Sequence, residues 1–276
     1  METARLILDS AADGAWNMSV DQALLETANS TGLISLRFYT WSQPTLSLGY
    51  FQSHLDRKLH QTSLDCQLVR RRTGGGAILH DDELTYSLCV PSENRWSQKN
   101  SELYRLVHRC IVQLLDELGI ESQIYGDIKE REPAGNDSAE NSKHRPQEKL
   151  ADEQNDISKP TVDQSSFMCF DRRSDGDIVI KRYKVVGSAQ RRNKKSLLQH
   201  GSILLKRSRF APTLKGIADL NDFGLRRDEL PELLAEKVFK CLRVHAFEGS
   251  LKAQEIEAAK NAHSLQFDSK QWNQQR

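Results

Sequence analysis

Two short segments of this chain carry residue types suited to acyl-transfer or anion-binding chemistry. The first is the run of residues 70–80, in which three arginines and three consecutive glycines precede a histidine. Glycine lacks a Cβ atom, so a triple glycine lets backbone N–H groups approach a ligand closely. Arginine adds a planar fork of donors for carboxylate or phosphate oxygens. The run therefore predicts a loop that binds an acyl or anionic group, and a glycine-rich hairpin with a solvated basic flank is the alternative.

The second segment combines a cysteine with a lysine farther along the chain. Cys169 lies between Phe167 and Phe170 and belongs to no amphipathic repeat, and Lys184 begins a stretch of small residues that allows close backbone approach. An ammonium near a thiol increases its thiolate fraction. We therefore interpret Cys169 and Lys184 as a candidate nucleophile–base pair for acyl transfer. A buried structural cysteine and a surface lysine are the alternative.

The apolar pattern indicates the elements that must position these segments. The clearest helix covers residues 100–118, because its apolar residues recur at i, i+3, i+4 and i+7 and Gly119 supplies a stop. Cys110 lies on that apolar face and is expected in the core. Ser19 and Gln22 have capping-box spacing at the start of another helix. The full set comprises strands at 5–8, 33–39, 45–50, 67–69, 84–90, 177–180, 184–188 and 197–205, the last interrupted at His200-Gly201, and helices at 18–29, 54–62, 100–118, 231–245 and 251–263.

Strands linked by short turns, with helices between some of them, predict an α+β, or mixed α/β, fold. The sheet is expected to be largely antiparallel or mixed, with flanking helices. The glycine run opens into a strand, so it does not fit a dinucleotide-binding fingerprint. We interpret residues 1–276 as one domain with a helical C-terminal portion at 211–276. Residues 129–165 hold fifteen charged residues, three prolines and no aromatic residue, which predicts a disordered surface insertion.

Composition excludes several classes of function. The net charge is +1, so no global field favours nucleic acid. The five cysteines include no CxxC pair, which argues against a zinc or redox site. The N-terminus lacks the features of a signal peptide, and no apolar run approaches the roughly 20 residues of a membrane span. We expect a cytoplasmic protein with reduced thiols that binds neither metal, nucleic acid nor membrane.

A series of motifs runs along most of residues 5–206, apart from the insertion. They are Asn17-Met18, Arg37-Phe38-Tyr39-x-Trp41-x-x-Pro44, Ser47-Leu48-Gly49-x-x-Gln52, Arg70-Arg71-x-Thr73-Gly74-Gly75-Gly76-Ala77 with His80, Lys184-Val185-Val186-Gly187-Ser188-Ala189-Gln190, and Leu198-Gln199-His200-Gly201-Ser202-Ile203-Leu204-Leu205. In type and order they resemble the lipoate–protein ligase/octanoyltransferase family. That family shares a fold with biotin–protein ligases, so the resemblance implies a biotin/lipoate ligase catalytic domain.

The family has two chemistries, and one short segment distinguishes them. Ligases use ATP to form an acyl-adenylate and usually carry an Asn-Asp pair upstream of the lysine motif. Here that region reads Met168-Cys169-Phe170-Asp171, which resembles the cysteine-dependent octanoyltransferase branch. The tail at 267–273 resembles that branch too. The acidic turn Asp175-Gly176-Asp177 could pass for a degenerate ligase motif, so an ATP-dependent lipoate–protein ligase is the alternative.

The resemblance implies a two-step acyl transfer. Cys169 would take octanoate from octanoyl-acyl carrier protein as a thioester and pass it to a lysine of a lipoyl-domain protein, such as the glycine cleavage H protein or a dehydrogenase E2 subunit. Lys184 would promote the thiolate and later accept a proton. No cofactor is expected, and ATP with Mg²⁺ would be needed only by a ligase. A non-catalytic acyl-binding scaffold is a third interpretation.

The expected substrate-binding residues come from the glycine run and from the two strands after Cys169. Backbone N–H groups of 187–189 and of the glycine run would stabilise the oxyanion, and apolar side chains would form an acyl tunnel. The basic runs 70–72 and 191–195 would dock acidic carrier proteins, or form an ordinary solvated cluster. The substrate-binding set is Arg70, Arg71, Thr73, Gly74, Gly75, Gly76, His80, Gly187, Ser188, Ala189, His200 and Gly201.

Overall fold

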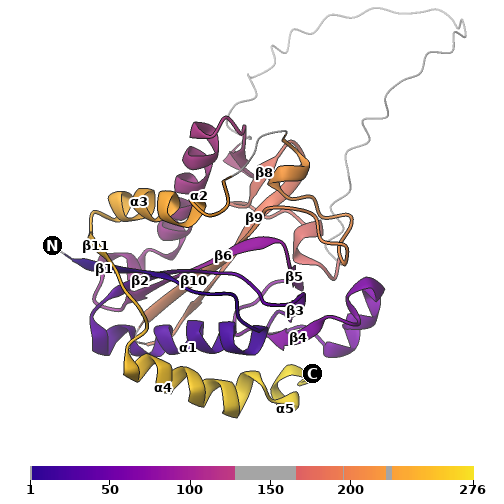
Figure 1. Cartoon of the computed structure of the whole chain (residues 1–276), viewed down its shortest axis with the longest axis horizontal. Helices are drawn as coiled ribbons and strands as arrows, with labels where there is room; N and C mark the ends of the chain where they lie inside the picture. The colour runs from indigo at the N-terminus through magenta and orange to yellow at the C-terminus, as the bar shows by residue number, and fades with distance from the viewer. Residues whose placement is uncertain (1, 128–165, 195, 222–225) are drawn as a thin grey trace, which may run out of the picture.

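The structure is a computed structural model that describes residues 2–127, 166–194, 196–221 and 226–276. An eight-stranded mixed sheet forms the centre of the protein (Figure 1). The strand order is β11-β1-β2-β6-β10-β9-β8-β7. β1 pairs in parallel with β11 and β2, whereas the other neighbouring pairs are antiparallel. The predicted mixed fold is therefore confirmed. The bounds are β1 Thr3–Leu8, β2 Ile34–Tyr39, β6 Glu83–Pro91, β7 Gln123–Ile124, β8 Ile178–Ile180, β9 Tyr183–Arg192, β10 Ser196–Leu204 and β11 His245–Glu248.

A second, three-stranded sheet carries the glycine run. β3 (Thr45–Leu48) pairs in parallel with β4 (Gln67–Arg70) and antiparallel with β5 (Ile78–His80). The glycine run connects β4 to β5 and so does not lead directly into the strand predicted at 84–90. His80 therefore lies on β5, at the edge of this sheet, where it pairs with Thr45 of β3.

Two pairs of helices cover opposite faces of the large sheet (Figure 1). α1 (Gly14–Thr31) and α4 (Ala253–Ala262) pack on one face, and α2 (Asn100–Glu117) and α3 (Leu230–Leu242) on the other. Side chains alternate between the two faces of a strand. On β6, accordingly, Leu88 and Val90 join the core beneath α2 and α3, whereas Cys89 joins the core beneath α1 and α4.

The helix predicted at 100–118 is confirmed, and Cys110 is fully buried in the core beneath it. The helix predicted at 18–29 begins earlier. Asp13 caps it by accepting a hydrogen bond from the N–H of Trp16 at 2.8 Å, and Gly32 ends it in the left-handed region with φ 65°. Ser19, expected near the cap, instead bonds the carbonyl of Ala15 inside the helix.

Two further expectations are corrected. β10 runs without interruption through His200 and Gly201, because both residues pair with β6 and with β9. The C-terminal portion contains α3, α4 and α5 (Lys270–Asn273), but it also contributes the exposed edge strand β11. The predicted insertion at 129–165 lies outside the described residues. In the described part of the chain no helix is long and apolar enough to cross a membrane.

Candidate active site

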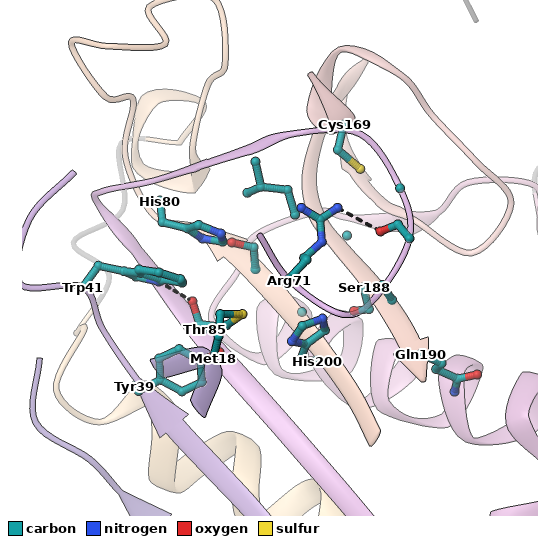
Figure 2. Close-up of a pocket in the computed structure, with 17 residues that line it drawn as sticks. Met18, Tyr39, Trp41, Arg71, His80, Thr85, Cys169, Ser188, Gln190 and His200 are labelled. Carbon is teal, nitrogen blue, oxygen red and sulfur yellow. Dashed lines mark hydrogen bonds between the residues drawn. The ribbon is translucent and has the colours of Figure 1, made fainter. Parts of the chain in front are cut away.

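A pocket of about 300 Å³ opens between the glycine loop and strands β9 and β10 (Figure 2). Cys169 lies at one side, and Trp41, Tyr39 and Met18 at the opposite side. The predicted site residues that line it are Arg71, Gly74, Gly75, His80, Cys169, Gly187, Ser188, Ala189, His200 and Gly201; the others are Met18, Tyr39, Trp41, Ile78, Thr85, Gln190 and Ser202. The glycine run and Cys169 thus meet in one cavity, whereas Lys184 does not line it.

The backbone of the glycine run holds the cysteine segment directly. The N–H of Ala77 donates to the carbonyl of Phe167 at 2.9 Å, and the N–H of Cys169 donates to the carbonyl of Ala77 at 2.7 Å. A Cβ atom on Gly76 would lie 3.0 Å from both the Cys169 nitrogen and the Phe167 oxygen. Gly76 does not line the pocket, but its missing side chain permits this approach. Cys169 then begins a single 3₁₀ turn, Cys169–Asp171.

Lys184 approaches the sulfur of Cys169 from β9. Its Nζ lies 3.6 Å from Sγ and 3.4 Å from the carbonyl oxygen of Cys169, and 2.9 Å from Oδ2 of Asp177. The three protons of an ammonium therefore have three acceptors. The Lys184 side chain is almost fully buried, and Nζ lies 5.0 Å from the centre of the Phe170 ring. This geometry brings together the predicted nucleophile–base pair, with the ammonium poised to stabilise a thiolate.

Asp177 completes this group, and sequence reasoning did not assign it a role. Burial raises the pKa of its carboxyl group, and the charge and hydrogen bond of Lys184 act against that rise. The N–H of Ser174 also donates to Oδ2 at 2.8 Å, which fixes the carboxylate within its turn. The available signal was the acidic turn 175–177, which had pointed only to a degenerate ligase motif.

Arg71 stabilises the glycine loop from inside. Nη1 donates to the carbonyl of Ser47 at 2.9 Å, and Nη2 donates to the carbonyls of Gly74 and Gly76 at 2.9 and 2.6 Å. Burial lowers the pKa of Arg71 to about 10, and the charge of Cys169 acts in the opposite direction. Gly75 takes φ 93°, a conformation that a side chain would strain. Arg71 thus uses much of its fork to shape the loop.

Arg70 does not reach the pocket. Its side chain is fully buried, and its guanidinium donates to backbone carbonyls on two segments. One segment is the turn after β3, with contacts to Gly49 at 3.0 Å and Gln52 at 2.6 Å. The other is the C-terminal helix α5 and its end, with contacts to Trp272 at 3.2 Å and Gln275 at 2.8 Å. Arg70 therefore links the C-terminus to the small sheet, and its guanidinium N–H groups are occupied by backbone carbonyls and not available to a substrate anion.

Thr73 and His200 form a buried chain of side chains beneath the pocket. Thr73 Oγ1 lies 2.7 Å from Nε2 of His200, and His200 Nδ1 lies 3.1 Å from Oδ2 of Asp21. Burial alone would raise the pKa of Asp21. The hydrogen bond from His200 and the charge of Arg37 together outweigh burial, so the net shift of this pKa is downward. His200 lines the pocket, whereas Thr73 is 2% exposed and does not. Thr73 therefore orients the imidazole.

His80 belongs to a second chain of the same kind. Its Nε2 lies 2.7 Å from the hydroxyl of Ser47, and its Nδ1 lies 2.7 Å from a carboxylate oxygen of Glu83. The ring stacks on Trp41 with centroids 3.8 Å apart. Burial raises the pKa of Glu83, but the charge and hydrogen bond of His80 and the hydroxyls of Ser202 and Thr85 lower it more. Ser47 is fully buried, so its hydroxyl helps to fix the pocket wall and is not accessible to a substrate.

Strands β9 and β10 supply the remaining wall. Ser188 pairs opposite Gly201, and a side chain on Gly201 would collide with Ser188 and with the ring of Tyr86. Gly187, which sits beside Lys184, has no side chain to obstruct the lysine. The use of backbone N–H groups at 187–189 as oxyanion donors stays a prediction. Within the described residues no cluster of three or more His, Cys, Asp or Glu could hold a metal ion.

Comparison with known sequences gives consistent matches. The model of the lipoyl protein ligase A/B catalytic domain matches residues 13–218. The octanoyltransferase LipM of Halalkalibacterium halodurans is 31% identical over 300 residues, covering 99% of each chain. The octanoyltransferase LipM of Bacillus subtilis is 30% identical over 302 residues, covering 100% of this chain and 99% of the relative.

Comparison with solved structures gives the same fold. A lipoate-protein ligase A bound with ATP superimposes with a TM-score of 0.69 at 21% identity and covers 99% of each chain. A bi-partite lipoate protein ligase from Thermoplasma acidophilum, studied with its E2 lipoyl domain, superimposes with a TM-score of 0.69 at 17% identity, covering 99% of this chain and 97% of that one. At these identities the likeness shows the fold alone.

Proposed function

The chain belongs to the lipoyl protein ligase A/B catalytic domain family, and we propose that it is an octanoyltransferase of protein lipoylation that carries the acyl group on Cys169. The observation that supports this most directly is the distance of 3.6 Å between Nζ of Lys184 and Sγ of Cys169, which lines the pocket. A thiol beside a cationic amine is one arrangement that activates a nucleophile for covalent acyl transfer.

In the first half-reaction the Cys169 thiolate attacks the carbonyl carbon of an octanoyl thioester on acyl carrier protein. A new carbon–sulfur bond forms, the bond to the sulfur of the carrier breaks, and the proton given up by Cys169 reaches the departing thiolate. Lys184 stabilises the attacking thiolate through its charge, and Asp177 holds the ammonium in position. Donors aimed at the developing oxyanion typically contribute roughly 3 kcal/mol each.

In the second half-reaction the amine of an acceptor lysine attacks the thioester carbon. A carbon–nitrogen bond forms, the carbon–sulfur bond to Cys169 breaks, and a proton from the amine ends on the cysteine sulfur. Nζ of Lys184 lies 3.6 Å from that sulfur, and we propose that it passes the proton. The balance of atoms requires no ATP and no metal, so we propose that the reaction uses neither.

The octanoyl chain would occupy the apolar side of the pocket, away from Cys169. Met18, Tyr39 and Trp41 line that side. Each buried methylene contributes about 0.8 kcal/mol, so the depth of the pocket can select chain length. The polar groups there are already paired. Trp41 Nε1, for example, donates to Thr85 Oγ1 at 2.8 Å, so a saturated chain beside Trp41 leaves this donor paired.

The acceptor in this proposal is a lipoyl-domain protein, either the glycine cleavage H protein or a dehydrogenase E2 subunit, and the donor is octanoyl-acyl carrier protein. A related ligase from Thermoplasma acidophilum is paired with an E2 lipoyl domain. Basic residues near the pocket support docking of acidic carriers. Arg191 donates to the carbonyl of Arg72 at 2.7 Å, and Arg192 and Lys194 are exposed beyond it. Such charges mainly raise the rate of encounter.

Intact-mass analysis tests the proposal. The protein is mixed with octanoyl-acyl carrier protein in the absence of ATP, and the expected result is one octanoyl adduct that peptide mapping locates on Cys169. Cys169→Ser should abolish the thioester. Cys241→Ser, which changes an exposed cysteine outside the pocket, is the matched control and should retain it. Product formation that strictly requires ATP would support the ligase alternative, and no adduct and no product under either condition would support a binding scaffold.

A further inference from the structure

A buried histidine on α2 contacts both walls that hold Lys184. His108 is fully buried, and its two ring nitrogens have separate partners. Nδ1 lies 2.5 Å from the carbonyl oxygen of Gly176, and Nε2 lies 2.6 Å from Oγ of Ser188. Gly176 precedes Asp177 in the turn that pairs with Lys184, and Ser188 lines the pocket. His108 itself does not line the pocket and cannot touch a substrate there.

The partners of His108 fix its tautomer. A carbonyl oxygen only accepts, so Nδ1 must carry the proton that is donated to Gly176. Nε2 of the neutral ring then accepts the hydroxyl proton of Ser188. Burial and the charge of Lys184 lower the pKa of His108 to about 4, and the hydrogen bond to Gly176 acts against them. The imidazole is therefore neutral near pH 7, which agrees with its hydrogen-bond partners.

A directed chain of hydrogen bonds follows from this tautomer. Because the Ser188 proton points to His108, the hydroxyl of Tyr86 must donate to Ser188 Oγ at 2.7 Å. Gln199 Nε2 in turn donates to the hydroxyl of Tyr86 at 2.9 Å. The Ser188 side chain is thus held by two partners behind the pocket wall, beside Gly187, where Lys184 passes. The chain runs from β10 through β6 and β9 to α2.

Tyr104 reinforces the same contact one helical turn earlier on α2. Its ring centre lies 4.3 Å from that of His108, and its hydroxyl lies 3.4 Å from the carbonyl oxygen of Ser188. Gly176 takes φ 98°, and a Cβ atom there would lie 2.7 Å from the ring of Tyr104. One face of α2 therefore packs closely against the turn before Asp177 and against β9.

We propose that His108 is a positioning residue for the acyl transfer, an imidazole that clamps the Asp177 turn and Ser188 to one helix and so keeps Lys184 against the sulfur of Cys169. The reaction is that of the proposed function, on which this inference rests. Loss of the clamp lets the turn and β9 separate. Lys184 then follows Asp177 away from Sγ, and Cys169 loses thiolate character although the pocket and its nucleophile remain.

The test measures the reactivity of Cys169 as a function of pH. The intact protein is alkylated with iodoacetamide, and peptide mass spectrometry follows Cys169 separately from the other cysteines. His108→Leu is expected to move the midpoint upward by about one pH unit and to slow alkylation at pH 7 about tenfold, because the rate follows the thiolate fraction. His108→Asn and His108→Gln, which can each keep one of the two hydrogen bonds, should give smaller shifts.

Val107→Ala is the matched control. Val107 is fully buried on the same helix and belongs to the apolar core, so it tests loss of packing without loss of the clamp. It should leave the alkylation profile as in wild type. A wild-type profile in folded His108→Leu would overturn the proposal. If His108→Leu does not fold, a wild-type profile in both His108→Asn and His108→Gln would overturn it.

The two proposals can fail separately. If the wild-type protein transfers no octanoyl group but the alkylation profile of Cys169 still shifts in the His108 variants, the proposed function is refuted and the positioning role of His108 is retained. A wild-type protein that transfers octanoyl, with His108 variants that match it in both profile and single-turnover rate, would refute the clamp alone. If the clamp is real, the variants should lose rate in single turnover and keep the KM for the acyl donor.

Discussion

One added methyl group should separate Lys184 from Cys169 while leaving the fold intact. A Cβ atom on Gly187 would lie 2.5 Å from Cε and 2.9 Å from Nζ of Lys184. Non-bonded carbons normally stay about 3.5–4.0 Å apart, so the end of the lysine would have to move by about 1 Å. Gly187 lies within β9, where an alanine fits the strand backbone. Gly187→Ala therefore changes the position of the ammonium more than it changes the sheet.

The size of the effect follows from Coulomb's law. At an effective dielectric constant of about 20, an ammonium and a thiolate attract by about 4.6 kcal/mol at the present 3.6 Å. The attraction falls to about 3.6 kcal/mol when the separation grows by about 1 Å. The loss of about 1 kcal/mol corresponds to a thiolate fraction about fivefold lower at neutral pH. Misplacement of the lysine during the chemical steps should reduce turnover further, by up to about 100-fold.

Two assays measure these effects. Alkylation of Cys169 against pH reports the thiolate fraction, and single-turnover transfer from octanoyl-acyl carrier protein reports the chemical steps. Gly249→Ala is the control, since it adds the same methyl group next to Arg5 at the opposite edge of the sheet. The reasoning is refuted if Gly187→Ala folds and matches wild type in both assays, because the contact of 3.6 Å between Nζ of Lys184 and Sγ of Cys169 would then affect neither the thiolate fraction nor the rate of transfer.

Three further predictions follow from the site. Arg70→Ala should lower the melting temperature and expose the C-terminal helix to limited proteolysis, because Arg70 contacts α5 and not the pocket. The alkylation profile of Cys169 should stay unchanged, and an altered profile would contradict this prediction. Trp41→Ala should let the enzyme accept acyl chains longer than octanoyl, measured by competition between donors of different length, because Trp41 lines the side of the pocket opposite Cys169; unchanged selectivity would place the acyl chain elsewhere. The free energy of unfolding should fall as the pH drops from 6.5 towards about 4, because the pKa of His108 is lowered in the folded state and the unfolded chain takes up the proton first. Denaturant titrations of His108→Gln should show a weaker dependence of the unfolding free energy on pH in that window.

Sequence reasoning paired Cys169 with Lys184, and the structure places these two side chains 3.6 Å apart. Cys169 and Lys184 could be paired because a thiol outside any amphipathic repeat and a lysine before small residues suggested one chemistry. The geometry shows why the pair forms. The glycine run lets the backbone of Cys169 bond to Ala77, which depends on contacts between distant segments that no local pattern encodes.

Two departures from the sequence-based expectation, at Arg70 and at His108, have the same physical cause. Arg70 and Arg71 are adjacent arginines with the same local pattern, yet their side chains point in different directions from β4 and the following turn. Arg70 donates to the carbonyl of Asn273 in α5 and to that of Gln275 just after it, about 200 residues later in the sequence, whereas Arg71 faces the pocket. The role of His108 could not be predicted from the sequence for a similar reason. It sits in a strongly amphipathic helix, where a polar residue on the buried face matters only once Gly176 and Ser188 are known to meet it.

The acyl-enzyme itself offers the most direct measurement. The protein is charged with octanoyl-acyl carrier protein, freed of the donor, and then mixed with a lipoyl-domain acceptor in the absence of ATP. If Cys169 carries the acyl group as proposed, the octanoyl mass leaves Cys169 and appears on one lysine of the acceptor at matching rates. A stable adduct that never reaches the acceptor, or transfer that begins only when ATP is supplied, would contradict the account.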